Sequence, residues 1–431
     1  MTTTYTRPSW AVRRVSAMLV RLADLGVPLG SLRRIRRSQP VLAVIATISI
    51  IFDPRSAMWN TLGEFLPWRR LIAMLVVLPL IGVLVVLAFA WPAARIGPRD
   101  LPVGVVGASP AAQQAVAGLT RSEPGGFSFR RYPGEAAARS AIEHRDIYGA
   151  FVISPSRVTA LGASAASPTV AQLLTAAGQQ LASHAPAHTA AAGQPRPVIQ
   201  VRSVDVVGTS ASDPRGLVLG VAPLPLTIVG VMMAAAIMLV ARFRPAWRQL
   251  AALAVVSAGA GLGAYLIVQD FLGALPGGPA ATWASLSLTL LAVSTSTAGL
   301  IALFGPVGLA AGAGLMIVVG NAFSGATSAP QLLPAAAGRI GQWLPAGAGG
   351  NLLRSTAYFN GNGAAGHLSV LIIWSVLGLA AIVAGQRFRS RFAAGPARNP
   401  PVASSPTAGY DRAAGSSPVP GPEPAECGHA A

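Results

Sequence analysis

Long apolar runs alternate with polar stretches along the chain, and the lengths of these runs predict membrane spans. Residues 71–91 read LIAMLVVLPLIGVLVVLAFAW without a charge, which matches the roughly 20 apolar residues that a spanning helix requires. Five more apolar runs follow a long polar insert, at residues 217–241, 250–268, 283–304, 307–319 and 368–384. The pattern predicts a polytopic α-helical membrane protein with six transmembrane helices, one before the insert and five after it.

The polar insert, residues 92–215, carries both strand and helix patterns. Runs of strand length and composition lie at residues 101–106, 127–132, 147–153 and 197–207. Helical patterns occupy residues 110–119, 134–144 and 168–183. Strands that alternate with helices are typical of an α/β domain with a largely parallel sheet. We therefore expect a small extracytoplasmic α/β domain between the first and second spans.

Arginines beside the apolar runs predict the orientation of the chain. Arg69 and Arg70 precede the first run, and the loop after the second run contains Arg242, Arg244 and Arg248. In contrast, the loop at 270–282 has one acid and no arginine. Because basic loops stay on the cytoplasmic side, we expect both termini in the cytoplasm, in a multi-pass protein of the cell membrane.

The two ends of the chain differ from the spans between them. Residues 1–70 form a basic region with an amphipathic helical pattern, which either lies on the anionic inner leaflet or docks a cytoplasmic partner. Residues 387–431 are rich in Pro, Ser, Ala and Gly, as in a disordered tail. Between them, the first span covers 71–91, and the five-helix domain covers 216–386 with an external loop at 322–366.

The composition removes several classes of function. All 32 basic residues are arginine, and a phosphate-binding P-loop requires a lysine. A separate polypeptide must therefore bind any ATP that drives this protein. The net charge of +18 reflects arginines crowded next to the spans, so we expect no nucleic-acid partner. The single cysteine, Cys427, forms no internal disulfide.

Ionisable chemistry is sparse in the sequence. The apolar runs contain no acid, histidine or arginine near their middles, which argues against ion-coupled transport because such transporters use charged groups within the membrane. His184 and His188 have a spacing that suits metal ligands, but no cysteine or carboxylate lies close by. Two solvated histidines are the favoured interpretation. With no catalytic motif in the sequence, we expect neither an enzyme nor a cofactor or metal.

Small and hydroxyl-bearing residues recur in the later spans. Two pairs of glycines are spaced four apart, Gly259 with Gly263 and Gly308 with Gly312, and residues 294–297 read STST. Small residues at this spacing allow helices to pack closely. The favoured interpretation is packing within the bundle or a dimer, and the alternative is a polar stripe that lines a substrate path.

The external loop contains apolar and aromatic residues separated by glycine and proline. This composition predicts short helices that lie on or dip into the outer leaflet, and an ordinary loop packed on the exported domain is the alternative. Five short motifs stand out here: NAFSG at 321–325, two Leu-Pro pairs at 333–334 and 344–345, Leu-Arg at 353–354 and Tyr-Phe at 358–359.

These motifs resemble the C-terminal region of type 2 ABC transporter permeases, in the branch of YhgE and the phage-infection protein. LPVGVV at 101–106 and DIYGAFVISP at 146–155 are similar to strands of the external domain of that branch. The resemblance covers roughly residues 70–390 and implies one span, a large external domain and five further spans. Residues 1–70 are not explained by it.

The resemblance implies a permease for export that pairs with a separate ABC ATPase subunit. It further implies a homodimer or two paired permeases in contact with membrane lipid, moving an amphiphilic or envelope-related substrate. The ATPase would contact the cytoplasmic loop at Arg242, Arg244 and Arg248. The external-loop motif supplies the candidate residues Ser324, Gly325, Leu344, Pro345, Arg354, Tyr358 and Phe359. A non-transporting envelope protein whose external domain binds a ligand or partner is the alternative hypothesis.

Overall fold

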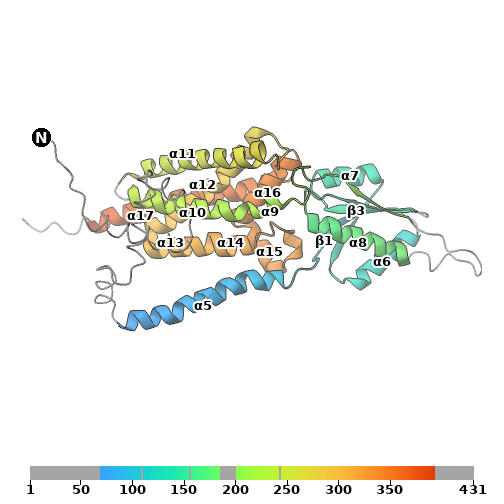
Figure 1. The fold of residues 1–431 in the computed structure, drawn as a ribbon, viewed down its shortest axis with the longest axis horizontal. Helices are drawn as coiled ribbons and strands as arrows, with labels where there is room; N and C mark the ends of the chain where they lie inside the picture. The colour runs from blue at the N-terminus through green and yellow to red at the C-terminus, as the bar shows by residue number, and fades with distance from the viewer. Residues whose placement is uncertain (1–67, 108–109, 155–156, 185–199, 242–243, 394–431) are drawn as a thin grey trace, which may run out of the picture. The chain divides into compact units, whose positions relative to one another are not determined.

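The computed structural model describes residues 68–107, 110–154, 157–184, 200–241 and 244–393 (Figure 1). It divides into two units, Met1–Gly97 and Pro98–Ala431, and each is described by itself. The amphipathic pattern near the N-terminus, the tail beyond residue 393, His188 and Arg242 lie outside the described residues.

The first unit contributes one helix, α5 (Trp68–Ala93). It begins three residues before the predicted span and continues through Pro79 to the end of the apolar run. Residues Ile72–Ala93 are long and apolar enough to cross a membrane. The prediction of a spanning-length helix at 71–91 is therefore confirmed.

In the second unit, the polar insert folds around a five-stranded sheet. The strands are β1 (Leu101–Val106), β2 (Phe127–Tyr132), β3 (Gly149–Ser154), β4 (Arg157–Gly162) and β5 (Gln200–Asp205), in the order β2-β1-β3-β4-β5. Only β3 and β4 pair antiparallel. The expected largely parallel sheet is confirmed, but β4 was not foreseen because its sequence RVTALG lacks a run of bulky apolar residues.

Helices cover both faces of this sheet. On one face, α6 (Pro110–Ser122) and α8 (Pro168–His184) pack against β1, β3 and β4 through a buried cluster that includes Leu119, Leu174 and Phe151. On the other face, α7 (Glu135–Glu143) buries Ala138 and Ile142. The domain is thus a three-layer α/β fold with its core on both sides of the sheet.

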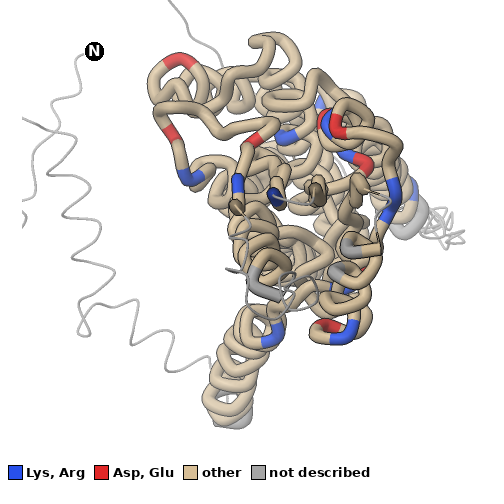
Figure 2. The backbone as a smooth tube through the Cα atoms, turned by 90° about the vertical axis from the view of Figure 1, so that its right-hand side faces the viewer, with Lys and Arg blue, Asp and Glu red and all other residues tan. Residues whose placement is uncertain are grey.

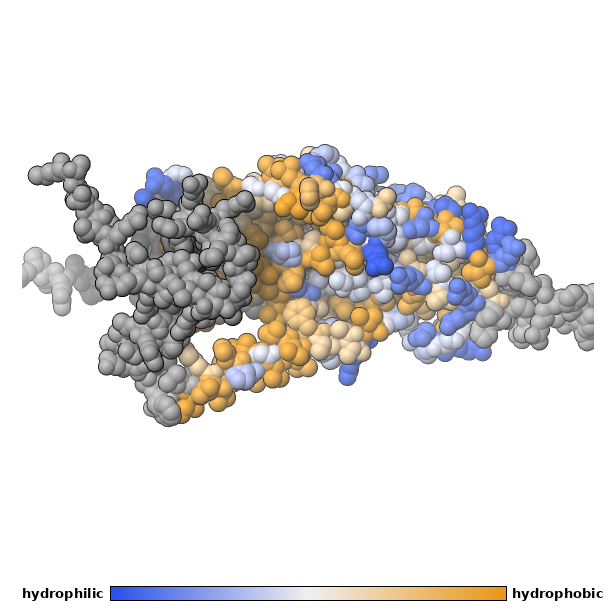
Figure 3. All heavy atoms as spheres, viewed as in Figure 1, coloured by the Kyte–Doolittle hydropathy of each residue, from blue (hydrophilic) through white to orange (hydrophobic). Residues whose placement is uncertain are grey.

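Four long helices of the second unit have the length and hydropathy of membrane spans. They are α10 (Pro223–Val240) with the short α9 (Leu217–Val221) before it, α11 (Ala246–Tyr265) with its π-helical extension η2 (Leu266–Phe271), α12 (Pro279–Phe304) and α17 (Ala364–Ala393). With α5, the described residues contain five such helices. Hydrophobic side chains gather over this bundle, and hydrophilic ones gather over the α/β domain (Figure 3).

The predicted span at 307–319 has a different form. It consists of α13 (Pro306–Ala313), the π-helical η3 (Gly314–Val319) and α14 (Gly320–Ala322), together a 17-residue apolar helix shorter than the other candidates. This segment runs antiparallel to α12, because Gly308 lies against Leu300 and Gly312 lies against Thr297.

Helix α12 is the centre of the bundle. In its most apolar window 67% of the residues are buried, the highest share among the five candidate spans. Each neighbour reaches it through a glycine. A Cβ atom built on Gly230 would lie 2.7 Å from Val293 Cγ1. One built on Gly261 would lie 2.1 Å from Ser287 Oγ, and one built on Gly349 would lie 2.4 Å from Thr289 Cγ2. The hydroxyl-rich run at 294–297 is buried in these contacts, which favours packing as its role.

The four glycines singled out from spacing fall into two groups. Gly308 and Gly312 contact α12, as packing within the bundle requires. Gly259 and Gly263 have no atom of the described chain within 4 Å of a built Cβ atom. The glycine of α11 that meets α12 is instead Gly261, two positions from each. Spacing alone does not determine which face of a helix turns toward its neighbour.

The segment predicted to be an external loop, residues 322–366, forms three short helices between α14 and α17. These are η4 (Pro330–Leu332), α15 (Ala335–Gln342) and α16 (Pro345–Tyr358). Twelve of the fourteen residues of α16 are buried. Near its N-terminal end, Gly349 contacts Thr289, which lies ten residues and roughly 15 Å along α12. The loop is therefore not a surface connection, and α16 is part of the bundle.

The two α11 glycines give a direct test of this packing. Gly261→Ala places a methyl group inside Ser287 and is expected to lower the free energy of unfolding by about 1–3 kcal/mol. Gly259→Ala meets no atom, so its expected effect is a gain of up to about 1 kcal/mol from helix propensity. Thermal unfolding of the two purified variants in the same detergent makes the comparison. Equal melting temperatures for the two would contradict the rotation of α11 described above.

Candidate functional site

The contact between the α/β domain and the bundle brings most of the external-loop motif together. Ser324, Leu344, Arg354 and Phe359 are all at most 5% exposed. Pro345 is buried as the first residue of α16, and Gly325 adopts a left-handed φ of 65°. Tyr358, at the end of α16, donates to the carbonyl of Ala274 at 2.8 Å. The residues named from sequence thus form one region at this junction.

The α/β domain reaches this region through Arg145, at the end of α7. The amides of Arg145 and Asp146 donate to the carbonyls of Ile142 and Ala141, which is the bonding pattern of a Schellman motif. Arg145 has the left-handed φ of 64° that this motif requires and that normally favours glycine. An arginine there costs roughly 1–2 kcal/mol, so its side chain is expected to compensate elsewhere.

The guanidinium of Arg145 bonds to α16 at three acceptors. It donates to the Asn351 carbonyl at 3.2 Å and to Asn351 Oδ1 at 2.9 Å, and it also donates to Ser355 Oγ. The same group lies 5.4 Å from the centre of the Phe359 ring, within cation–π range. Burial lowers the pKa of Arg145 from its ordinary value. These bonds fasten the domain to α16.

A second arginine, Arg354, shares Asn351 with Arg145. Its NH1 donates to Asn351 Oδ1 at 3.1 Å and its NH2 donates to the Ala326 carbonyl at 3.0 Å. Its Nε is buried without a hydrogen-bond partner among the described residues. Neither guanidinium forms an ion pair with a carboxylate of the described chain. Two cations therefore converge on one neutral amide.

The amide of Asn351 is held in place from the other side. Its Nδ2 donates to Gln342 Oε1 at 2.6 Å, and Gln342 Nε2 donates to the Ser324 carbonyl at 2.9 Å. Ser324 Oγ in turn donates to the Asn321 carbonyl at 2.9 Å. The chain of bonds links α14, α15 and α16, and it orients Asn351 Oδ1 toward both arginines.

A further contact between the domain and the loop lies close by. Tyr148 donates to Gln331 Oε1 at 2.7 Å, and burial raises the pKa of the Tyr148 hydroxyl. Arg99 donates from its amide to the Gln331 carbonyl at 3.0 Å and from NH1 to the Leu332 carbonyl at 2.9 Å. Besides the contact at the end of α7, the α/β domain therefore touches the bundle through Tyr148, just before β3, and through Arg99, just before β1.

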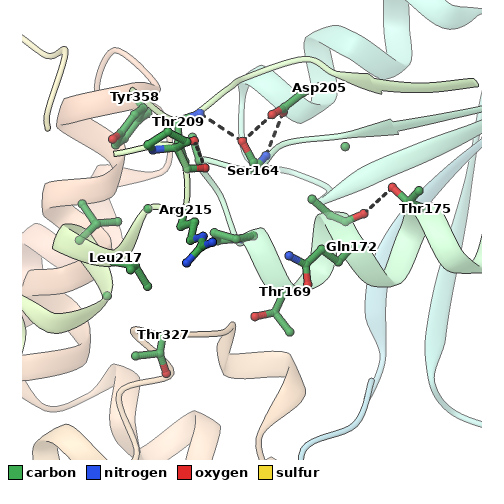
Figure 4. A pocket seen from close by; sticks show the side chains of 18 of the residues that line it. Ser164, Thr169, Gln172, Thr175, Asp205, Thr209, Arg215, Leu217, Thr327 and Tyr358 are labelled. Carbon is green, nitrogen blue, oxygen red and sulfur yellow. Dashed lines mark hydrogen bonds between the residues drawn. The ribbon is translucent and has the colours of Figure 1, made fainter. Parts of the chain in front are cut away.

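Beside this junction lies a cavity of about 680 Å³ (Figure 4). Its walls come from α8, the ends of β4 and β5, α9 and the loop at Ala326 and Thr327, with Arg354 and Tyr358 from α16. Arg215 extends into the space between Leu217 on α9 and Gln172 on α8 (Figure 4). The size is that of a typical small-molecule site, and the lining combines polar and apolar residues.

The other candidate residues lie away from this junction. Arg244 is exposed in the turn between α10 and α11, and Arg248 is exposed in the first turn of α11. The guanidinium of Arg248 lies 5.1 Å from the centre of the Trp247 ring. The carbonyl of Arg244 accepts from Gln386 Nε2 of α17 at 3.0 Å. Their proposed contact with an ATPase stays a prediction. Of the two histidines considered as ligands, His184 ends α8 and His188 is outside the described residues.

Sequence patterns did not identify Arg145, Asn351 or Tyr148. Arg145 follows Glu143 and His144 at a helix end and looks like an ordinary solvated residue. The available signal was that arginine, not the usual glycine, occupies the position where α7 ends. Recognising this signal requires knowing the exact residue at which the helix ends. Asn351 sits three residues before Arg354 in a run of small residues, with no motif of its own.

No protein-family model, curated protein or solved structure matches the chain. The likeness to type 2 ABC permeases therefore stays a prediction from the motifs quoted above.

A pair of asparagine variants tests the junction. Asn351→Ala removes the shared acceptor of two guanidinium groups and is expected to reduce stability by about 2–4 kcal/mol, because it leaves charged donors unpaired. Asn362→Ala removes one hydrogen bond to the Glu143 carbonyl and is expected to reduce the stability of the protein by about 1 kcal/mol. Denaturant unfolding of both proteins in detergent provides the comparison. An Asn351→Ala protein as stable as Asn362→Ala would show that the two arginines do not depend on Asn351.

Proposed function

We propose that this chain is the membrane permease subunit of an ABC-type exporter, which works with a separate ATPase subunit to move an amphiphilic or envelope-related substrate outward across the cytoplasmic membrane. The observation that carries the proposal is the direct bonding of an α/β domain to α16, a buried helix of the bundle, through Arg145 and Asn351. A domain fastened in this way moves with the helices that hold it.

The proposal takes the short apolar helix Pro306–Ala322 as the sixth span. At 1.5 Å per residue its 17 residues extend about 26 Å, close to the roughly 30 Å of a bilayer core. Bilayers adapt to a mismatch of a few Å at small cost. The segment runs from the end of α12 back to α14, where Asn321 Nδ2 donates to Thr227 Oγ1 at 2.8 Å. With six spans, both ends of the chain lie on the side of Arg244 and Arg248, opposite to the α/β domain.

An ATPase would act on the turn between α10 and α11. The exposed Arg244 and Arg248 offer positive charge there. Two amide side chains bind this turn to the bundle: Gln249 Nε2 donates to the Ala241 carbonyl at 2.7 Å, and Gln386 Nε2 donates to the Arg244 carbonyl. A push on the turn would therefore be transmitted to α10, α11 and α17 together.

The second candidate function is a non-transporting envelope protein whose external domain binds a ligand. The cavity beside α8 and α9 favours it, because a ligand site on the domain needs no transport step. Under this hypothesis the helices serve as an anchor and a relay. The presence or absence of an associated ATPase distinguishes the two functions.

Co-purification tests the exporter. Native membranes are solubilised and the tagged full-length chain is isolated; we expect an ATP-binding subunit to come with it, and Arg244→Glu with Arg248→Glu to release that subunit. Arg130→Glu, an exposed arginine on β2, is the control for added negative charge. Retention of the ATPase by the double variant would contradict the proposed contact. Isolation without any ATPase, and no hydrolysis after candidate subunits are added back, would count against the exporter itself.

Thiol labelling tests the orientation. On a Cys427→Ser background, Ser128→Cys on β2 and Trp247→Cys at the start of α11 each expose a single thiol. We expect a membrane-impermeant maleimide to label Ser128→Cys in intact cells and to label Trp247→Cys only after the membrane is opened. Labelling of both positions from the same side would contradict six spans in the described arrangement.

A further inference from the structure

The cavity between the α/β domain and α9 contains two arginines whose charges are not neutralised within the described chain. Arg215 is exposed to the cavity and has no hydrogen bond or ion pair with another described residue. Arg354 lines the inner wall, is 4% exposed and retains an unpartnered Nε. Buried charge without a counter-ion is costly, and an anion in the cavity would supply the opposite charge to both arginines.

Two carboxylates in this part of the chain, Asp205 and Asp213, accept hydrogen bonds from other residues. Asp205, which also lines the cavity, accepts from the Ser164 amide at 2.9 Å and from Ser164 Oγ at 2.5 Å (Figure 4). Asp213 accepts from the amides of Leu217 and Val218 at 3.0 and 2.8 Å. Both acids are thereby committed to holding the walls in place. Among the charged residues that line the cavity, the two arginines outnumber the single aspartate, so the lining carries a net positive charge.

This positive character is local to the cavity. Acidic and basic positions are interspersed over the α/β domain, which Figure 2 views end-on. A general attraction of anions to the domain therefore does not account for the two unpaired arginines. Their meeting in one cavity depends on the fold, since Arg215 precedes α9 and Arg354 lies on α16.

The wall formed by α9 is apolar and faces outward. Leu217 and Val221 both line the cavity and are 58% and 57% exposed. They belong to the candidate span Leu217–Val240, so their exposed faces are where acyl chains would lie. The opposite wall carries polar side chains from α8, including Thr169, Gln172 and Thr175 (Figure 4). The cavity therefore joins a polar compartment to the start of a membrane helix.

We propose that this cavity binds the anionic headgroup of a membrane amphiphile, with Arg215 and Arg354 on its phosphate or carboxylate group and its acyl chain along Leu217 and Val221. The assignment deepens the proposed function, on which it rests for the claim that the amphiphile is the exported substrate. A volume of about 680 Å³ accommodates a headgroup rather than a whole lipid, which fits a ligand whose tail remains in the bilayer.

Lipid binding to the full-length protein tests the assignment. The probe is phosphatidylglycerol with a fluorescent acyl chain, titrated against the purified protein in a neutral detergent, with phosphatidylcholine of the same chains as the uncharged comparison. We expect phosphatidylglycerol to bind more tightly, and Arg215→Gln to weaken its binding about tenfold or more because a charge-assisted contact is lost. Arg130→Gln, on the β2 edge of the sheet, removes the same charge outside the cavity and is expected to change the affinity less than twofold.

Several results would overturn the assignment. One is an equal loss of affinity in Arg215→Gln and Arg130→Gln, which would mean that only net charge matters. Another is equal binding of the two lipids, with no effect of Arg215→Gln. Glycerol phosphate is added as a soluble competitor. Full displacement at a similar concentration would show that the headgroup binds alone and that the α9 wall contributes nothing, against the proposal of an amphiphile.

Arg354→Gln is a second variant for the inner wall. We expect it to weaken phosphatidylglycerol further in the Arg215→Gln background, and melting curves of the same samples show whether the protein remains folded. If the folded double variant binds as tightly as Arg215→Gln, Arg354 is not a ligand contact and the two-arginine site is wrong. The outcome is separable from that of the exporter. If the protein binds lipid but no ATPase, the lipid site stands and the exporter proposal fails. If an ATPase is associated but phosphatidylglycerol does not bind, the exporter proposal stands and the lipid site fails.

Discussion

A guanidinium buried without a carboxylate partner constrains the whole junction. Burial of an unneutralised ion costs several kcal/mol unless hydrogen bonds replace water around it. Arg354 obtains two such bonds, from Asn351 and Ala326. Asn351 is available only because Gln342 holds its amide in one orientation, and Gln342 is itself tied to Ser324. The positions of α14, α15 and α16 thus follow from the requirements of one charge.

The same amide connects the α/β domain to the bundle. Arg145 reaches Asn351 from a left-handed position that glycine would occupy more easily. The unfavourable backbone is offset by bonds that only a long, multidentate side chain can make. Inside the bundle, α16 packs on α12. The glycines Gly230, Gly261 and Gly349 let α10, α11 and α16 approach α12 closely. A displacement of α16 would therefore disturb its contacts with both the domain and α12. This coupling is the observation on which the proposal of export rests.

The sequence revealed the features that depend on local composition. The long apolar helices and the strands β1 and β2 lie where hydrophobic runs placed them, because length and side-chain pattern decide these elements. Strand β4 was not predicted from the sequence, because its small residues give little hydrophobic pattern. The contact glycine of α11 was misplaced, since Gly259 and Gly263 share a face that turns away from α12 while Gly261 meets Ser287. Helix rotation is a tertiary property that spacing leaves open. The motif residues near Arg354 were found, but their partner Arg145 is separated from Asn351 by 206 positions in the chain, and no local pattern connects them.

The central claim is that the α/β domain and the α16 region behave as one body. The most direct test is a distance measurement by double electron–electron resonance. Nitroxide labels are placed at Ala136→Cys on α7 and Ala365→Cys at the start of α17, both exposed positions, in a Cys427→Ser protein reconstituted in lipid. The bonds of Arg145 to Asn351 predict a single narrow distribution of distances. A broad distribution, or two well-separated distances, would show that the domain moves independently of the bundle and would contradict the account.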